Sequence, residues 1–259
     1  MNAIKQIWEY RHLIYFKAYA DFQTESRSNI LGPLWWILDP IINTFIYYLV
    51  FGVFLARGGD DFVPFLIVGI VAWQWFQGSI VTASVSIWKS APTFRQAALP
   101  KIIFPLTRIT TALFRHVFAL IIAVAVLIFY GYTPELYWGY VLVPLAVQIL
   151  LLTCISLNTA AVIPFFPDFA SLVQYILRIG FYMSGVLYVL TDLPESIQFY
   201  LRLNPMVHVI NAYRDILLYQ LPLDWTLLGM VSIFSVVGIW VGLSMISYFD
   251  GIYAKRIQS

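Results

Sequence analysis

The residues that could support catalysis or metal binding are few and widely separated in this sequence. The three histidines, His12, His116 and His208, lack the spacing of metal ligands, and neither H-E-x-x-H nor G-x-S-x-G occurs. No glycine is followed by lysine, so there is no G-x-x-x-x-G-K phosphate-binding loop. The single cysteine, Cys154, lies in an apolar run and cannot form an intrachain disulfide. The sequence therefore disfavours an enzyme and predicts no catalytic residue, metal site or cofactor in this chain.

Aromatic side chains could support a different kind of chemistry, because they make up 18% of the residues. Rings with a polar edge offer flat apolar faces against which sugar rings can pack. For any single ring, however, a place in the core or in a membrane-interface belt is the simpler interpretation. The candidates for an aromatic-lined substrate path are Trp35, Trp36, Trp73, Trp75, Tyr182 and Tyr188.

Asp39 is the one ionisable residue between Pro33 and Ala56. A carboxylate that faced lipid at the bilayer centre would cost about 2–3 kcal/mol or more, so it should face water or another polar group. We expect Asp39 to lie at the cytoplasmic mouth of the path, beside the tryptophans that precede it. The alternative is a purely structural role, in which Asp39 snorkels to the interface or pairs with a basic residue such as Arg115 or Arg178.

The composition places these residues in a membrane protein. Hydrophobic residues make up 61% of the 259 residues and charged residues 11%, against roughly 45–50% apolar residues in soluble domains. The apolar runs are continuous, without the period-two alternation of a membrane β-barrel, which predicts helices. We expect one transmembrane domain over residues 1–259, with an N-terminal arm at 1–32, a six-helix bundle at 33–249 and a tail at 250–259. The six crossings lie at about 33–56, 63–88, 109–130, 137–163, 171–190 and 225–249.

Shorter helices are expected beside the crossings. Residues 3–22 carry a narrow apolar stripe that predicts an interfacial helix along the membrane. The region 191–224 contains two candidate short helices, one at Pro194–Arg202 and one beginning at Asn204-Pro205. We expect both to lie in the outer leaflet, re-entrant or at the interface, or to form a cap packed on the bundle. Gly238-x-x-x-Gly242 in the last crossing could permit close helix contact.

Basic residues set the expected orientation. The arm carries four Lys or Arg residues, the loop 89–108 carries four and the tail two, against three on the opposite side, namely Arg57, Arg202 and Arg214. Because cytoplasmic loops are enriched in Lys and Arg, the arm, this loop and the tail should be cytoplasmic. Both termini are therefore expected inside the cell.

The loop at 89–108 is the candidate docking element for an energy-supplying partner. It contains no acidic residue, and two prolines stiffen it around a short apolar segment. We expect the apolar residues to be exposed as a knob that fits another protein, whereas a basic loop lying on anionic headgroups is an equally acceptable interpretation. The residues assigned to this coupling are Arg95, Pro100, Lys101, Ile102, Ile103, Phe104 and Pro105.

Four segments resemble the membrane (permease) subunit of bacterial polysaccharide-exporting ABC transporters, which move O-antigen, capsule or teichoic acid. These segments are Leu31-Gly-Pro-Leu-Trp-Trp36 with Pro40 and Val50-Phe-Gly52, Leu99-Pro-Lys-Ile-Ile-Phe-Pro105, residues 172–194, and Asn204-Pro-Met-Val-His-Val-Ile-Asn-Ala-Tyr-Arg214. The chain departs from the usual pattern at Pro167-Asp168, at Ser184-Gly-Val186 and at Asp39.

The resemblance implies a homodimer in the bacterial inner membrane with two copies of a separate ATP-binding subunit, which would hold the ATP and Mg. It also implies a lipid-linked polysaccharide as substrate and membrane lipids as surroundings, with no role for nucleic acid. An ABC exporter of a drug or lipid remains an alternative, and so does a membrane scaffold that transports nothing.

Overall fold

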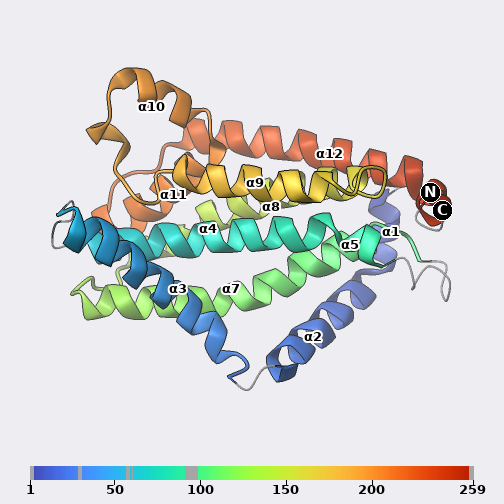
Figure 1. The fold of residues 1–259 in the computed structure, drawn as a ribbon, viewed down its shortest axis with the longest axis horizontal. Coiled ribbons are helices and arrows are strands. Elements are labelled where there is room, and N and C mark those ends of the chain that lie inside the picture. Colours follow the sequence, from blue (N-terminus) through green and yellow to red (C-terminus); the bar gives the residue numbers. More distant parts are fainter. Residues whose placement is uncertain (1–2, 29–30, 57–58, 60, 91–98, 257–259) are drawn as a thin grey trace.

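The fold is a bundle of long helices that lie roughly side by side (Figure 1). The computed structural model describes residues 3–28, 31–56, 59, 61–90 and 99–256. Within these residues all regular secondary structure is helical. Five stretches are long and apolar enough to cross a membrane. They are α3 (Leu34–Tyr47) continued by the π-helix η1 (Tyr48–Phe54), α4 (Phe62–Ser84), α7 (Ile103–Phe129), η2 (Leu136–Val141) continued by α8 (Leu142–Val162), and α12 (Trp225–Arg256).

The sequence predicts the fifth crossing as one helix over about 171–190, but the helix observed there is shorter. Helix α9 (Phe169–Tyr182) has 14 residues, and non-helical backbone follows it from Ser184 to Val189. Gly185 has a φ of 71°, a conformation that ends helices and that glycine adopts without steric cost. The residues Ser184 to Leu187 are buried, and non-helical backbone at membrane depth is tolerated where protein covers it.

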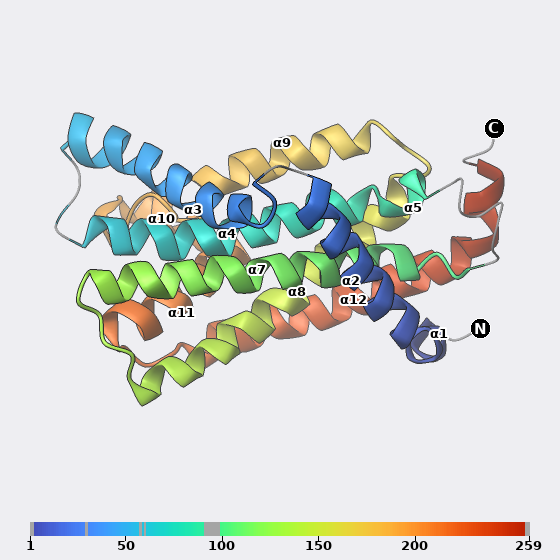
Figure 2. The same ribbon diagram turned by 90° about the horizontal axis from the view of Figure 1, so that it is seen from below.

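Two helices replace the single interfacial helix expected at 3–22. They are α1 (Ala3–Glu9) and α2 (Arg11–Ser28), and α2 packs against α7 at a steep angle to the bundle (Figure 2). The side chains that α1 and α2 bury are Ala3, Ile14 and Ala18. Much of the predicted apolar stripe stays exposed, as Ile4, Trp8, Tyr15 and Tyr19. A membrane surface would cover such side chains.

Both described ends of the chain lie at the same end of the bundle as the short helix α5 (Ser86–Lys89), as both ribbon views show. A separate apolar core, which we call the terminal cluster, lies there. It joins α1, α2, α5, the start of α7, α8 and α12. Its buried members are Ala3, Ile14, Ile87, Ile102, Ile103, Leu157, Ala160, Ala161, Ile246 and Tyr253.

Helices α8 and α12 pack closely because two glycines of α12 face α8. A Cβ at Gly238 would overlap the sulfur of Cys154, and one at Gly242 would lie 2.8 Å from the Cβ of Leu157. The Asn158 side-chain amide donates to the carbonyl oxygens of Cys154 and Gly238, each at 2.8 Å. The predicted glycine pair therefore serves packing within one chain.

The opposite end of the bundle carries the short helices expected between the last two crossings (Figure 1). They are η3 (Leu190–Asp192), α10 (Glu195–Arg202), α11 (Pro205–Arg214) and the π-helix η4 (Asp215–Tyr219). Asn204 caps α11 by accepting a hydrogen bond from the Met206 backbone at 3.0 Å, which confirms the predicted helix start. Helix α11 is buried against α4, α8 and α12 and belongs to the bundle core.

Candidate functional site

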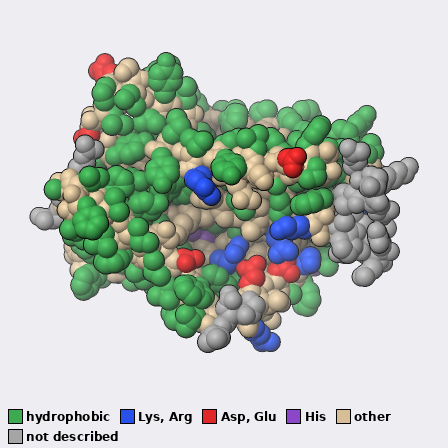
Figure 3. Space-filling model, viewed as in Figure 1, with side chains coloured by type: hydrophobic (Ala, Val, Ile, Leu, Met, Phe, Trp, Pro, Cys, Tyr) green, Lys and Arg blue, Asp and Glu red, His purple; other side chains and the backbone are tan. Residues whose placement is uncertain are grey.

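A cavity of about 370 Å³ with both polar and apolar lining residues lies between α3, α4 and α7. On this face of the molecule a hollow is visible, with a histidine at its floor and acidic and basic side chains beside it (Figure 3). Its apolar walls come mainly from valine and alanine side chains. The polar and aromatic residues that line it are Trp36, Asp39, Gln74, Trp75, Gln77, Ser79, Thr82, Arg115 and His116.

The deepest polar groups of this cavity lie on α4 and α7. The rings of Trp75 and His116 stack with their centroids 4.0 Å apart and their planes 8° from parallel. Trp75, Ser79 and His116 are 5%, 0% and 3% exposed. Within the described part of the chain, no hydrogen bond reaches the Trp75 indole N–H, the Ser79 hydroxyl or either ring nitrogen of His116. Native proteins pair most buried polar groups, so these three side chains are exceptions among the described residues.

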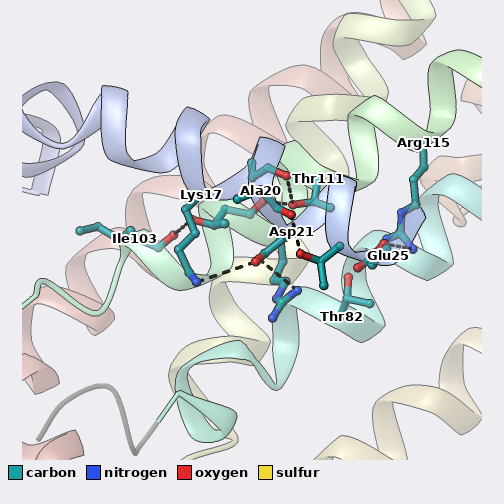
Figure 4. Close-up of polar contacts among 12 residues, drawn as sticks. Lys17, Ala20, Asp21, Glu25, Thr82, Ile103, Thr111 and Arg115 are labelled. Atoms are coloured by element: carbon teal, nitrogen blue, oxygen red, sulfur yellow. Dashed lines mark hydrogen bonds and ion pairs between the residues drawn. The ribbon is translucent and has the colours of Figure 1, made fainter. Parts of the chain in front are cut away.

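Charged side chains of α2 and α7 lie close together beside the cavity (Figure 4), and α3 contributes Asp39 to its lining. Arg115 contacts Glu25 at 3.4 Å, which ties α7 to α2 beside the cavity. One helical turn away along α2, Asp21 contacts Arg108 at 3.3 Å. Asp39 forms no ion pair with any described residue, so the expected alternative of a pair with Arg115 or Arg178 is not what the structure has.

Trp36 and Trp75 are the two predicted path tryptophans that the structure brings together with Asp39. The Trp36 ring stacks on Phe22 of α2 with a centroid separation of 4.8 Å, which fixes its position at the cavity edge. Trp35, the residue before it, is 40% exposed and lies outside the cavity lining.

The other three predicted aromatics lie elsewhere. Trp73 is 3% exposed, and its indole N–H donates to the Gln77 side chain at 2.9 Å, so it belongs to the core. Tyr182 and Tyr188 lie at and after the end of α9, where the Tyr188 hydroxyl donates to the Tyr182 carbonyl at 2.8 Å. Two residues turn an α-helix by about 200°, so Trp73 and Trp75 point to opposite sides of α4.

The docking knob expected at 99–105 is not exposed. Ile102, Ile103 and Phe104 are 1%, 0% and 3% exposed, and Pro100 and Pro105 are also buried. The prediction of an exposed knob is therefore wrong. Its physical reason is the terminal cluster, which takes up Ile102 and Ile103 beside α8 and α12.

A polar anchor holds the same segment. The Lys101 backbone N–H donates to Asp250 of α12 at 2.9 Å, and the Lys101 ammonium lies 3.8 Å from the same carboxylate. Arg95, the remaining residue of the coupling prediction, lies outside the described residues. The described part of the segment is thus fixed to the bundle.

Arg214 is a buried residue whose role the sequence did not reveal. It is 2% exposed, and its guanidinium donates to the carbonyls of Gly185 at 2.7 Å, Val186 at 2.9 Å and Phe65 at 3.1 Å. A Cβ at Gly69 would lie 2.7 Å from this guanidinium, so the glycine leaves the space it occupies. The arginine ties α11 to α4 and to the non-helical backbone after α9. The sequence does contain one indication that Arg214 is buried. It follows Ile210 by four residues and so lies on the apolar stripe of α11.

The fold defines a helical membrane protein with several candidate spans. Residues 13–218 match the family model described as ABC-2 type transporter, and the chain belongs to this family. It is 27% identical over 250 residues to the O-antigen export system permease protein RfbA of Myxococcus xanthus, with 95% of each chain covered. It is 25% identical over 226 residues to the protein of that name from Klebsiella pneumoniae, with 87% of each covered. It is also 25% identical over 236 residues to the polysialic acid transport protein KpsM of Escherichia coli, covering 87% of this chain and 88% of that protein.

Proposed function

We propose that this chain is the transmembrane subunit of an ATP-driven ABC transporter that exports a lipid-linked polysaccharide across the bacterial inner membrane. The observation that carries the proposal is the similarity over 95% of both chains to an O-antigen export permease, together with the family match. A polysialic acid transport protein among the relatives supports the wider class of polysaccharide cargo. The exported polymer would be an O-antigen, a capsule or a teichoic acid.

In this proposal six crossings place both termini in the cytoplasm. Five crossings are the long helices, and the remaining one consists of α9 with the buried backbone that follows it. The meeting of α1 and α12 at one end of the bundle supports an even number of crossings. The end that carries α10 and α11 then faces outward, and the terminal cluster lies near the cytoplasmic surface.

The working unit would be a homodimer with two ATP-binding subunits, which would supply the nucleotide site and its Mg. Exposed apolar side chains along α9, such as Leu172, Ile176 and Ile179 at 49%, 55% and 59% exposure, need lipid or a second copy to cover them.

The loop 89–105 keeps the coupling role that the sequence suggested, but its buried apolar residues cannot themselves be the docking surface. Residues 99–105 would instead transmit movement of the docked loop to α8 and α12 through the terminal cluster.

The substrate path would run beside the cavity, with Asp39 at the cytoplasmic mouth and Trp36 and Trp75 along the lining. Trp35, Trp73, Tyr182 and Tyr188 lie outside the cavity and keep a path role only if they line a part of it that a second copy completes.

Export in cells tests this function. The gene is deleted in its host and restored together with the gene for its ATP-binding partner, and the polymer at the cell surface is measured against the lipid-linked polymer retained inside. We expect deletion to remove surface polymer and to cause internal accumulation. A partner variant that lacks the phosphate-loop lysine serves as the control for ATP dependence. Surface polymer that is unchanged by deletion would refute the proposal.

A further inference from the structure

Helices α3 and α9 lie on the same face of the bundle, where both pack on α4. They touch each other through the rings of Tyr47 and Phe181, whose centroids are 5.3 Å apart. The side chains that the two helices bury are Pro40, Thr44, Val173 and Leu177. Most of the surface of α3 and α9 is therefore left for something else to cover.

Arg178 shows that lipid alone does not cover this face. It is exposed and lies nine residues after Phe169, or about 14 Å along α9, which is near the middle of a hydrocarbon core about 30 Å thick. Its guanidinium lies 5.6 Å from the Tyr175 ring of the same helix and forms no ion pair with a described residue. A charged side chain at that depth meets protein or water.

Asp39 supplies the opposite charge on α3. It is exposed at the edge of the cavity and forms no ion pair with a described residue. Arg115, the basic residue of the same lining, contacts Glu25 at 3.4 Å, so these three side chains together leave one negative charge. Asp39 therefore attracts a cation from outside the chain.

Arg178 and Asp39 lie at similar depths in the bundle, because the contact between Tyr47 and Phe181 sets the two helices at the same height there. Arg178 precedes Phe181 by three residues, about 4.5 Å along α9. Asp39 precedes Tyr47 by eight residues, about 12 Å along the tilted α3. The two charges thus differ in depth by about 8 Å at most, a difference that the two long side chains can bridge.

A second set of opposite charges lies nearer the end that carries the terminal cluster. Lys17 and Arg108 both contact Asp21, at 3.9 Å and 3.3 Å, which leaves one positive charge on α2 and α7. Asp168 is exposed and precedes Arg178 by ten residues, about 15 Å along α9. In Figure 3 a basic side chain lies to the left of an acidic one above the hollow, and below it an acidic side chain lies to the left of several basic ones. The two edges of the face thus carry opposite charges in the same order.

The symmetry of a membrane dimer brings these two edges together. Two copies in one membrane have the same orientation, so the two-fold axis that relates them runs along the membrane normal and keeps every residue at its own depth. In Figure 1, α9 runs along the upper part of this face, and α3 and α2 lie in its lower part. A two-fold rotation about the long axis of the bundle therefore places α9 of one copy opposite α3 and α2 of the other.

We infer that the face formed by α2, α3 and α9 docks a second copy of this chain, with Arg178 of each copy opposite the partner's Asp39. Asp168 then lies opposite the partner's Lys17 and the partner's Arg108. The inference rests on the proposed function, which includes a homodimer, and deepens it by naming the face and the charges that set the register of the two copies. Because Asp39 borders the open cavity, its pair stays partly hydrated and fixes orientation more than affinity.

Cross-linking between two differently tagged chains tests the face. In a Cys154→Ala background one chain carries Arg178→Cys and the other Asp39→Cys, and both are produced with the ATP-binding partner. A short bis-maleimide is added to the membranes, and a pull-down through one tag followed by detection of the other reports a link between copies. We expect this mixed pair to be linked. The control replaces Arg178→Cys by Val237→Cys, an exposed residue of α12 on the opposite side of the bundle, and should not be linked (Figure 2).

Charge reversal tests the pair itself. Arg178→Asp and Asp39→Arg each place like charges opposite each other, whereas a chain with both changes restores opposite charges. Energy transfer between labelled full-length copies in liposomes, at several protein-to-lipid ratios, measures dimerisation. We expect each single variant to weaken dimerisation about 5- to 30-fold, the factor for two lost ion pairs that are partly exposed, and the double variant to recover most of it.

Lys5→Asp is the matched control for charge reversal. It makes the same change of charge at an exposed residue of α1, which packs against α12, away from this face. Alone it should leave dimerisation unchanged, and combined with Asp39→Arg it should restore nothing. The cross-link needs neither reversal variant, so the test stands if one of them fails to fold.

Three results would overturn the inference. They are cross-linking of the mixed pair no greater than that of the α12 control, single charge reversals that leave dimerisation unchanged, and a double variant whose loss is the sum of the two single losses. The deletion and complementation assay separates the docking face from the proposed function. Export that depends on the chain while the mixed pair is not linked rejects the face alone. Linking and rescue in a chain whose deletion leaves surface polymer unchanged would reject the function alone.

Discussion

Buried polar residues of this chain fall into two groups with opposite properties. Arg214 has hydrogen-bond acceptors for its guanidinium in three backbone carbonyls. Trp75, Ser79 and His116 have none among the described residues. An unpaired buried polar group costs about 1–3 kcal/mol. The first group therefore stabilises the fold, and the second group is kept at a cost to stability.

Replacement of Arg214 by glutamine should destabilise the protein, because the shorter side chain cannot reach all three carbonyls. We expect a loss of about 3 kcal/mol, from one or two carbonyls left unpaired. The measurement is thermal unfolding in nanodiscs, with Arg202→Gln as control, since Arg202 is exposed and its guanidinium donates to the Gln198 side chain of its own helix. Equal melting temperatures for the two variants would contradict this role.

Replacement of Asp39 by asparagine should leave the melting temperature nearly unchanged, because Asp39 is exposed and unpaired among the described residues. Export should change only modestly. A buried ion pair broken in the same way would instead cost about 3–5 kcal/mol.

Trp36→Ala should reduce export more than Trp35→Ala, because Trp36 lines the cavity and Trp35 does not. Equal export by the two tryptophan variants would argue against a path beside the cavity.

Some of these residue positions could be predicted from the sequence and others could not. Asp39 stands out because a lone carboxylate in an apolar run must face something polar. The burial of Ile102 to Phe104 could not be predicted, because their partners in α8 and α12 lie more than fifty residues away and local composition carries no information about them. His116 looked unremarkable for the same reason, since Trp75 reaches it only through the packing of α4 on α7.

At the scale of elements, the contact between α8 and α12 depends on the absence of a side chain at Gly238. Gly238→Ala should destabilise the protein by about 1–3 kcal/mol through overpacking against Cys154. The matched control is Gly229→Ala in the same helix, where an added Cβ meets nothing within 4 Å. Thermal unfolding compares the two variants.

A second variant separates steric overlap from a change in helix propensity. Cys154→Ala removes the sulfur that the new Cβ would meet, so the double variant Gly238→Ala with Cys154→Ala should recover part of the lost melting temperature. If Cys154→Ala and Gly238→Ala simply add, the two residues are not in contact and the close packing of α8 on α12 is refuted.

Element boundaries were predictable where a local signal exists. Asn204-Pro205 begins α11 as expected, because a cap and a proline at the first helical position act locally. The early end of α9 was harder to predict, since Ser184-Gly185 lies in an apolar run long enough to cross. What allows the break is Arg214, which supplies donors to the carbonyls that the helix no longer pairs. That compensation comes from another element.

At the scale of the whole molecule, the proposed six crossings can be tested by cysteine labelling. Cys154 is replaced by alanine, and single cysteines are placed at Glu135, Asp192 and Lys89, all exposed in the structure. An impermeant maleimide added to intact cells should label the first two and leave the third until the cells are opened. Labelling of Lys89→Cys from outside would reverse the proposed orientation.

The terminal cluster is where the whole bundle could respond to ATP hydrolysis, since it joins both ends of the chain to the segment 99–105. Asp250 holds that segment through the Lys101 backbone N–H at 2.9 Å and the ammonium at 3.8 Å. The ion pair is partly exposed and adds little by itself, so the backbone bond should carry the positioning. Asp250→Asn keeps an acceptor for this N–H and should retain export, whereas Asp250→Ala loses it and should let the partner hydrolyse ATP with reduced export. The measurement is polymer exported per ATP hydrolysed in the reconstituted complex. A ratio that falls equally in both variants would assign the effect to charge, and an unchanged ratio in both would remove Asp250 from the coupling route.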